Sequence, residues 1–135
     1  MLNNSNKGII SFQMPHLEKH YTIKEIFNYF NVDINGKIGN SGQIIGGIRI
    51  MKKNINLINL IDIENKTLYD NPLLFTDYYN KINQEKYFKD NRHEQSIFSV
   101  IRKIYGSILL SDETWFTPFG NNKSLNYPFW ATRKK

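Results

Sequence analysis

The sequence contains no cysteine, which excludes disulfide bridges and metal sites built on thiolates. It also lacks any run of about 18 apolar residues, the length that a membrane-spanning helix requires. No apolar segment of the kind found in signal peptides follows Met1. From these absences we expect a protein without a membrane span, and the lack of cysteine favours a cytoplasmic location.

Basic side chains outnumber acidic ones, and the formal net charge is +6 at pH 7. Such a balance can favour anionic partners. The lysines are scattered, however, and the dense cluster is the terminal run Thr-Arg-Lys-Lys, so we do not expect nucleic acid to be the partner. With 135 residues, 40% of them hydrophobic, the chain is long enough for one domain with its own core.

Strands and helices are predicted to alternate, which is typical of an α/β chain. Short apolar runs rich in β-branched residues predict strands at 8–14, 44–51 and from 107 onward. Apolar residues at helical spacing predict helices at 23–30, 53–70 and 91–105. The segment 71–88 is predicted to be loop and turn.

Residues that cap helices mark where two of these helices begin. Thr22, followed by Glu25 three residues later, fits a capping box and is predicted to begin the first helix. Asp90 or Asn91 is predicted to cap the third helix, which ends at Gly106. The buried stripe of that helix is predicted to comprise Ile97, Val100, Ile101 and Ile104.

Glycines precede and interrupt the second predicted strand, in the run GNSGQIIGG. The spacing fits neither the dinucleotide fingerprint nor a phosphate loop, and the glycines do not open a helix as phosphate loops do. Inside a strand, Gly46 and Gly47 indicate either a bulge or a place where a ligand or another backbone approaches closely.

Two further groups of acidic and histidine residues are considered as metal ligands. His16, Glu18 and His20 would suit zinc if they lay on one helix face, but Pro15 precedes them and we favour a surface polar run. Asp62 and Glu64 lie in a helical pattern and are interpreted as solvated surface. Neither group predicts a metal site.

The run NRHEQS places four large polar residues at the head of the third helix. A helix N-terminus favours an anion, and Glu94 alone would be an ordinary stabilising acid there. Arg92 and His93 instead oppose the helix dipole, and Arg suits a bidentate grip on phosphate or carboxylate. His93, Glu94 and Gln95 offer an acid or base beside a two-way hydrogen-bonding group. Both interpretations, a decorated cap and a binding or catalytic site, stay open.

The C-terminal runs SDETWF and YPFWATR combine indole rings with charged groups. Indole faces beside carboxylates are typical of sugar sites, where the ring stacks on the apolar face of a pyranose and the acid accepts hydroxyl protons. The alternative is that the tryptophans fill the core. The candidate sugar-binding residues are Asp112, Glu113, Trp115, Trp130 and Arg133.

Together the runs GNSGQIIGGIRIMKKN, DNRHEQSIFSVIRKIYG, DETWF and YPFWATR resemble the C-terminal half of GT-A-type glycosyltransferase-like proteins of bacterial polysaccharide clusters and large DNA viruses. The run EKHYTIKEIFNYF resembles the segment that precedes the glutamine strand in that group. The usual form carries aspartate where this chain has Glu94. The resemblance implies a partial GT-A-like (nucleotide-diphospho-sugar transferase-like) sheet with flanking helices, the acceptor-side half of the fold.

The implied reaction is transfer of a sugar from a nucleotide-sugar donor to a hydroxyl of a glycan acceptor. By resemblance, Glu94 is the catalytic carboxylate with His93 and Gln95 beside it. Gln43 and the Gly46-Gly47 strand would line the cleft, Arg92 or Arg133 would meet phosphate, and Trp115 would border the acceptor. A divalent Mn²⁺ or Mg²⁺ ion would belong to the Asp-x-Asp motif of an N-terminal nucleotide-binding half, which this sequence does not show.

Two expectations follow from that comparison. The chain by itself should be weakly active or inactive, working with a partner half, and apolar surface on its first strand should be exposed and favour self-association. The alternative function is a non-catalytic carbohydrate- or partner-binding module that uses the same Trp and acidic residues without metal or donor.

Overall fold

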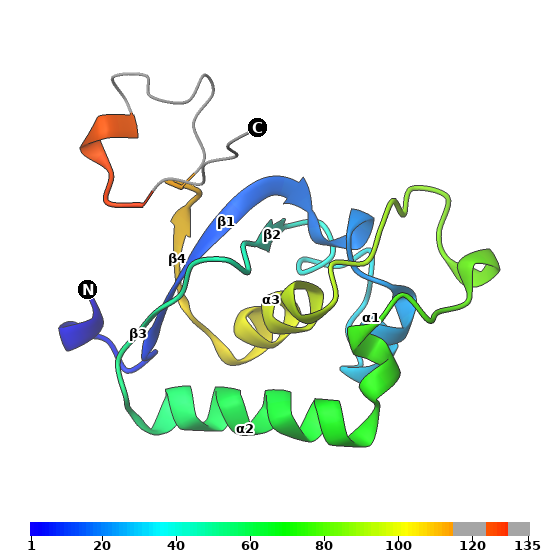
Figure 1. Ribbon diagram of the computed structural model, residues 1–135, viewed down its shortest axis with the longest axis horizontal. Helices are drawn as coiled ribbons and strands as arrows, with labels where there is room; N and C mark the ends of the chain where they lie inside the picture. The colour runs from blue at the N-terminus through cyan, green and yellow to red at the C-terminus, as the bar shows by residue number, and fades with distance from the viewer. Residues whose placement is uncertain (115–123, 130–135) are drawn as a thin grey trace.

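The computed structural model describes residues 1–114 and 124–129. It is a mixed α/β structure in which one small sheet is covered by helices (Figure 1). Helix α3 (Glu94–Tyr105) lies against the sheet, and the longer α2 (Ile55–Asp70) lies outside α3 (Figure 1). The short α1 (Lys24–Tyr29) packs at one end of α3.

Strand β1 (Ile9–Leu17) is the centre of the sheet. On one side it pairs antiparallel with β2 (Gly42–Ile44) and β3 (Ile50–Met51), and on the other it pairs parallel with β4 (Ile108–Ser111). The prediction of one continuous strand at 44–51 was therefore wrong. The segment between β2 and β3 leaves the ladder because its backbone is held by α3, as shown below.

The first strand is also not exposed, which contradicts the expectation drawn for it. Ile9, Ile10 and Phe12 are buried, because β1 has a strand on each side and α3 over one face. Phe129 contacts Phe12 edge to face, with 6.4 Å between ring centroids. Large apolar side chains are exposed instead on α2, of which Tyr69 is 86% exposed.

The amphipathic pattern of α3 is confirmed for most of its length. Ile97, Val100 and Ile101 are fully buried, whereas Ile104 is 37% exposed and lies at the edge of the core. Gly106 ends the helix with φ of 99°, a conformation that favours glycine. The main core cluster joins β1, α1, α2 and α3 through Ile9, Ile23, Ile26, Leu57, Leu60, Leu74, Ile97, Val100 and Ile101.

The predicted helix caps were wrong at both helices. The N-cap of α1 is Ile23, because the Thr22 hydroxyl donates to the Glu18 carboxylate and not to the helix. The N-cap of α3 is His93. At α2 the Asn54 side-chain oxygen accepts from the backbone N–H of Leu57 at 2.8 Å, which satisfies one free donor of the first turn.

Short 3-10 turns complete the chain that the structure describes. One of them, Glu18–His20, follows β1, and two interrupt the predicted loop at Pro72–Phe75 and Lys81–Asn83. The others are Leu2–Asn4 and Ser124–Asn126. No helix within the described residues has the length and apolar character needed to cross a bilayer.

Candidate functional site

A buried carboxylate organises the polar interior between β1 and α3. Glu18 is fully buried, and its two oxygens accept hydrogen bonds from Thr22 (2.6 Å) and from Ser99. Lys103 Nζ lies 2.6 Å from Glu18 Oε2, with its own side chain 5% exposed. Burial lowers the pKa of Lys103, and the nearby Glu18 carboxylate opposes that effect. A buried ion pair of this kind needs its neighbouring hydrogen bonds to offset the loss of hydration.

Gln43 extends this network to the head of α3. Its side chain is 1% exposed, and its amide nitrogen donates to Glu18 Oε1 and to the Tyr21 carbonyl, both at 3.1 Å. The amide of Gln95 donates to Gln43 Oε1 at 2.7 Å. Gln43 is therefore positioned to hold the neighbouring elements together and has no surface for a ligand.

Gln95 also explains why the chain leaves the sheet after β2. Its side-chain oxygen accepts from the backbone N–H of Gly46 at 3.0 Å. A β-carbon built on Gly46 would lie 3.1 Å from the Gln95 side chain, so the close approach favours glycine at this position. Gly47 has nothing within 4 Å of such a carbon and is exposed. The sequence left open a bulge or a close approach at this position. Gly46 is indeed closely approached, but by the Gln95 side chain and not by a ligand or another backbone.

Glu94 is exposed, while its two neighbours in the polar run, His93 and Gln95, are fixed by hydrogen bonds. His93 adopts φ of 51°, and its Nε2 lies 2.7 Å from Asp77 Oδ1. Gln95 is fixed by its two hydrogen bonds to the β2 segment. Arg92 is exposed and lies over the Tyr21 ring, 4.9 Å from its centroid. The arrangement holds the backbone of Glu94 in place and leaves its carboxylate in solvent.

A second feature lies where β4 and its parallel pairing with β1 end, at Ser111 and Gln13. It is an open cleft of about 490 Å³. Ligands in open α/β sheets commonly bind outside the carboxyl ends of parallel strands. The cleft is lined by Gln13, Met14, Pro15, Gly42, Ser111 and Asp112.

Asp112 is fixed at the edge of this cleft by the turn that follows β4. Its backbone N–H donates to the Gln13 carbonyl at 3.0 Å, and its Oδ1 accepts from the backbone N–H and hydroxyl of Thr114 at 2.9 and 2.6 Å. Oδ2 makes no hydrogen bond among the described residues. Asp112 and Glu113 are both partly exposed. The turn thus places Asp112 Oδ2 beside the cleft without a hydrogen-bond partner in the part of the chain that the structure describes.

The cleft and the head of α3 lie at the same end of the sheet. Gln13 of β1 pairs with Ile44 on one side and with Ser111 on the other. Ile44 follows Gln43, which contacts Gln95, and Ser111 precedes Asp112. Ile44 and Ser111 are therefore two strand spacings of about 4.8 Å apart, or roughly 10 Å. The structure therefore brings Gln43, Gly46 and the 92–95 run together at one end of the sheet, with Asp112 and Glu113 across it.

A third group of charges, Arg49, Glu64, Glu94 and Arg102, lies where α2 packs against α3. Arg102 is buried, with Nη1 3.1 Å from Ser11 Oγ, and burial lowers its pKa to about 10. The guanidinium carbon of Arg49 lies 3.8 Å from the centroid of Phe98. Burial raises the pKa of the Glu64 carboxyl to about 7, with Glu94 adding to the shift and both arginines opposing it. Glu64 is thus only partly exposed, unlike the solvated surface predicted for it.

The predicted surface run His16–Glu18–His20 was wrong at its centre, because Glu18 is buried in the network described above. His16 and His20 both contact the Tyr21 ring. Among residues 1–114 and 124–129, no three His, Asp or Glu side chains gather so as to hold a metal ion. The described residues do not fit Mn²⁺ or Mg²⁺, and no chemical step is assigned to either. Trp115, Trp130 and Arg133 lie outside the described residues.

Sequence reasoning missed the residues that hold this site together. The signal for some of them was present: Ser96, Ser99 and Lys103 follow a helical spacing beside the apolar stripe of α3. Glu18, the partner of Ser99 and Lys103, lies 81 and 85 positions away from them, so a single sequence does not indicate the pairing.

The fold defines a mixed α/β protein with a small mixed sheet. Comparisons with protein-family models, with curated proteins and with solved structures found no match to this chain.

Proposed function

We propose that this chain forms the acceptor side of a glycosyltransferase-like site, within a GT-A-like fold. The observation that carries the proposal is the cleft at the carboxyl end of β4, beside residues 13–15 of β1, which has Asp112 at its edge. Its volume suits a small saccharide, since ligand sites commonly measure about 300–1,000 Å³. Glu113 and Trp115 come next along the chain and carry the acid and indole groups that sugars favour.

Glu94 is the residue we assign to proton transfer. In the proposed reaction the acceptor hydroxyl oxygen forms a bond to the anomeric carbon of the donor sugar. The bond from that carbon to the diphosphate oxygen breaks, and the nucleoside diphosphate leaves with the bonding electrons. The acceptor proton passes to the Glu94 carboxylate. Support comes from the exposure of Glu94 and from the fixed residues on either side of it, because a catalytic group needs a held backbone and an accessible side chain.

Calorimetry with free glycans, and with UDP- and GDP-sugars in the presence and absence of Mn²⁺, tests this proposal. We expect glycans to bind and Trp115→Ala to weaken that binding. Glu94→Gln should retain glycan binding and lose any transfer measured with a donor. Asp62→Asn, an exposed change on α2, is the matched control and should alter neither property.

Transfer that is lost in Glu94→Gln would favour the transferase over its alternative, a carbohydrate-binding module. Glycan binding that is lost in Trp115→Ala, with no transfer from any donor, would fit either that module or an acceptor half without its donor half. Transfer that survives Glu94→Gln would remove Glu94 from the mechanism. Absence of both glycan and donor binding would contradict the proposal as a whole.

A further inference from the structure

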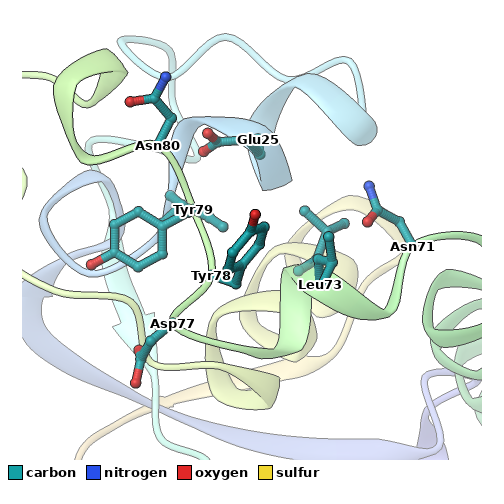
Figure 2. Close-up of a pocket in the computed structure, with 9 residues that line it drawn as sticks. Glu25, Asn71, Leu73, Asp77, Tyr78, Tyr79 and Asn80 are labelled. Atoms are coloured by element: carbon teal, nitrogen blue, oxygen red, sulfur yellow. The ribbon is translucent and has the colours of Figure 1, made fainter.

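A separate hollow lies between the start of α1 and the segment 71–80, which follows α2. It measures about 510 Å³ and combines apolar, aromatic and polar side chains. Figure 2 shows Tyr78 standing between Tyr79 and Leu73, with its hydroxyl end toward Glu25. The full lining comprises Ile23, Glu25, Asn71, Leu73, Leu74, Asp77, Tyr78, Tyr79 and Asn80.

Tyr78 is unusual because its ring is exposed while its backbone is held. The residue is 77% exposed, yet its N–H donates to Thr76 Oγ1 at 3.1 Å. The two residues before Tyr78 are also held. The Asp77 carboxylate contacts His93 at the head of α3, and the Thr76 carbonyl accepts from the Asn91 amide at 3.3 Å. A large aromatic ring is thus presented to solvent on a fixed turn, and the core does not account for its position.

Apolar and aromatic side chains form the walls beside this ring. Tyr79 packs edge to face on Phe88 with 5.6 Å between centroids, so it is the inner wall. Leu74 is buried beneath the hollow, and Leu73 is 49% exposed at its side. Such a surface suits a ligand with one apolar face.

Hydrogen-bonding groups that the fold does not use surround the same hollow. Glu25 Oε2 accepts from Gln84 at 2.9 Å, while Oε1 has no partner among the described residues. The side-chain amide of Asn71 and the hydroxyl of Tyr78 likewise make no hydrogen bond within the described part of the chain. A carboxylate, an amide and a phenol around an aromatic face match the hydroxyl groups and the C–H face of a pyranose.

The charge of the lining narrows the class of sugar. Glu25 and Asp77 are acidic, and the described residues that line the hollow include no Lys or Arg, although the whole chain carries +6. Phosphate, uronic acids and other anions would be repelled. We propose that this hollow, the Tyr78 site, binds a neutral or amino sugar unit of a glycan. The proposal does not depend on the transferase reaction or on the cleft beside Asp112.

Titration of the whole chain with maltose, cellobiose and N,N′-diacetylchitobiose, followed by NMR, tests the Tyr78 site. At least one of these sugars should shift the amide signals of Tyr78 and Asn80, and digalacturonic acid should bind more weakly. Tyr78→Ala should weaken binding about tenfold, because it removes the exposed ring on which the sugar is proposed to stack. Tyr78→Phe should retain most of the affinity.

Matched variants keep the test independent of folding and of the proposed function. Tyr69→Ala removes an equally exposed tyrosine from α2 and should leave binding at the Tyr78 site unchanged. Asp112→Asn should also leave it unchanged, because the cleft beside Asp112 is a separate site. Absence of binding at that cleft in the unaltered chain would count against the transferase proposal and not against this one. Glu25→Gln removes a negative charge from the lining, so it should reduce the difference in affinity between neutral and anionic sugars. The inference is overturned if no neutral sugar shifts Tyr78, if Tyr78→Ala binds as well as the unaltered chain, or if only a proline-rich peptide binds there.

Discussion

Gln95 connects the head of α3 to the β2 segment, because its amide donates to Gln43 Oε1 at 2.7 Å while its oxygen accepts from Gly46 N–H at 3.0 Å. Gln95 is therefore a structural member of the polar run NRHEQS, as are the buried Asn91 and Ser96. Its neighbour Glu94 is exposed, as is Arg92.

Removing the Gln95 side chain should destabilise the protein. Gln95→Ala leaves Gly46 N–H and Gln43 Oε1 without partners, and the expected loss is about 1–3 kcal/mol in the free energy of unfolding. Glu94→Ala, one residue away and exposed, should change it by no more than about 0.5 kcal/mol. Denaturation in urea measures both values. Equal effects of the two substitutions would contradict the structural role given to Gln95.

The two adjacent glycines should respond differently to the same substitution. Gly46→Ala forces the Gln95 side chain to move and should cost about 1 kcal/mol or more, as overpacking does. Gly47→Ala meets open space and should be neutral or slightly stabilising, by up to about 1 kcal/mol. Thermal unfolding of the two variants gives the comparison. In the Gln95→Ala background the cost of Gly46→Ala should shrink, since the obstructing side chain is gone.

The buried pair of Glu18 and Lys103 predicts strong coupling between the two positions. Lys103→Met leaves an unpaired buried carboxylate, and we expect a loss of about 3–5 kcal/mol. Glu18→Gln in the same chain removes that charge, so the double variant should be more stable than Lys103→Met alone. A double-mutant cycle by chemical denaturation measures the coupling. Additive effects of the two substitutions would show that the pair does not interact as described.

Glu64 predicts a specific dependence of stability on pH. Burial raises its pKa in the folded state to about 7, above the ordinary value of 4.5. The folded state therefore binds the Glu64 proton more tightly than the unfolded state does. The contribution of Glu64 to the free energy of unfolding is fully present below about pH 4.5 and is lost as the pH rises through 7. Glu64→Gln mimics the protonated form, so it should stabilise the protein at pH 8 and have little effect at pH 4.

The measurement is the free energy of unfolding of both proteins between pH 4 and 8. Glu94→Gln is a useful second variant, because the Glu94 carboxylate contributes to the shift and its removal should lower the pKa of Glu64. An unchanged difference between Glu64→Gln and the unaltered protein across this range would contradict the assignment.

The parts of the fold that could be predicted are those with a local pattern. The stripe Ile97, Val100 and Ile101 has helical spacing, and it is buried as expected. The continuous strand at 44–51 was wrong because Gly46 is held by Gln95, a contact 49 positions away. The local pattern at Thr22 predicts a helix cap, but its hydroxyl donates to the buried Glu18 carboxylate instead.

The candidate site was predictable to a similar degree. The run that contains Glu94, and the acid Asp112, could be selected from the sequence, because their residue types alone are those of binding or catalytic groups. The sequence did not identify the buried frame of Glu18 and Lys103, whose members are brought together only by folding. Nor did it indicate Tyr78, which stood in a segment interpreted as loop and turn.

The most direct test of the account is an NMR titration of the chain with neutral oligosaccharides, comparing the unaltered protein with Asp112→Asn. Asparagine can still accept from Thr114, so the turn should persist while the free carboxylate oxygen is lost. We predict shifts of the Gln13, Gly42 and Asp112 amides that are lost in Asp112→Asn and kept in Asp62→Asn. Shifts that spare all three amides, or that survive Asp112→Asn undiminished, would contradict the assignment of the β1–β4 cleft as the acceptor site.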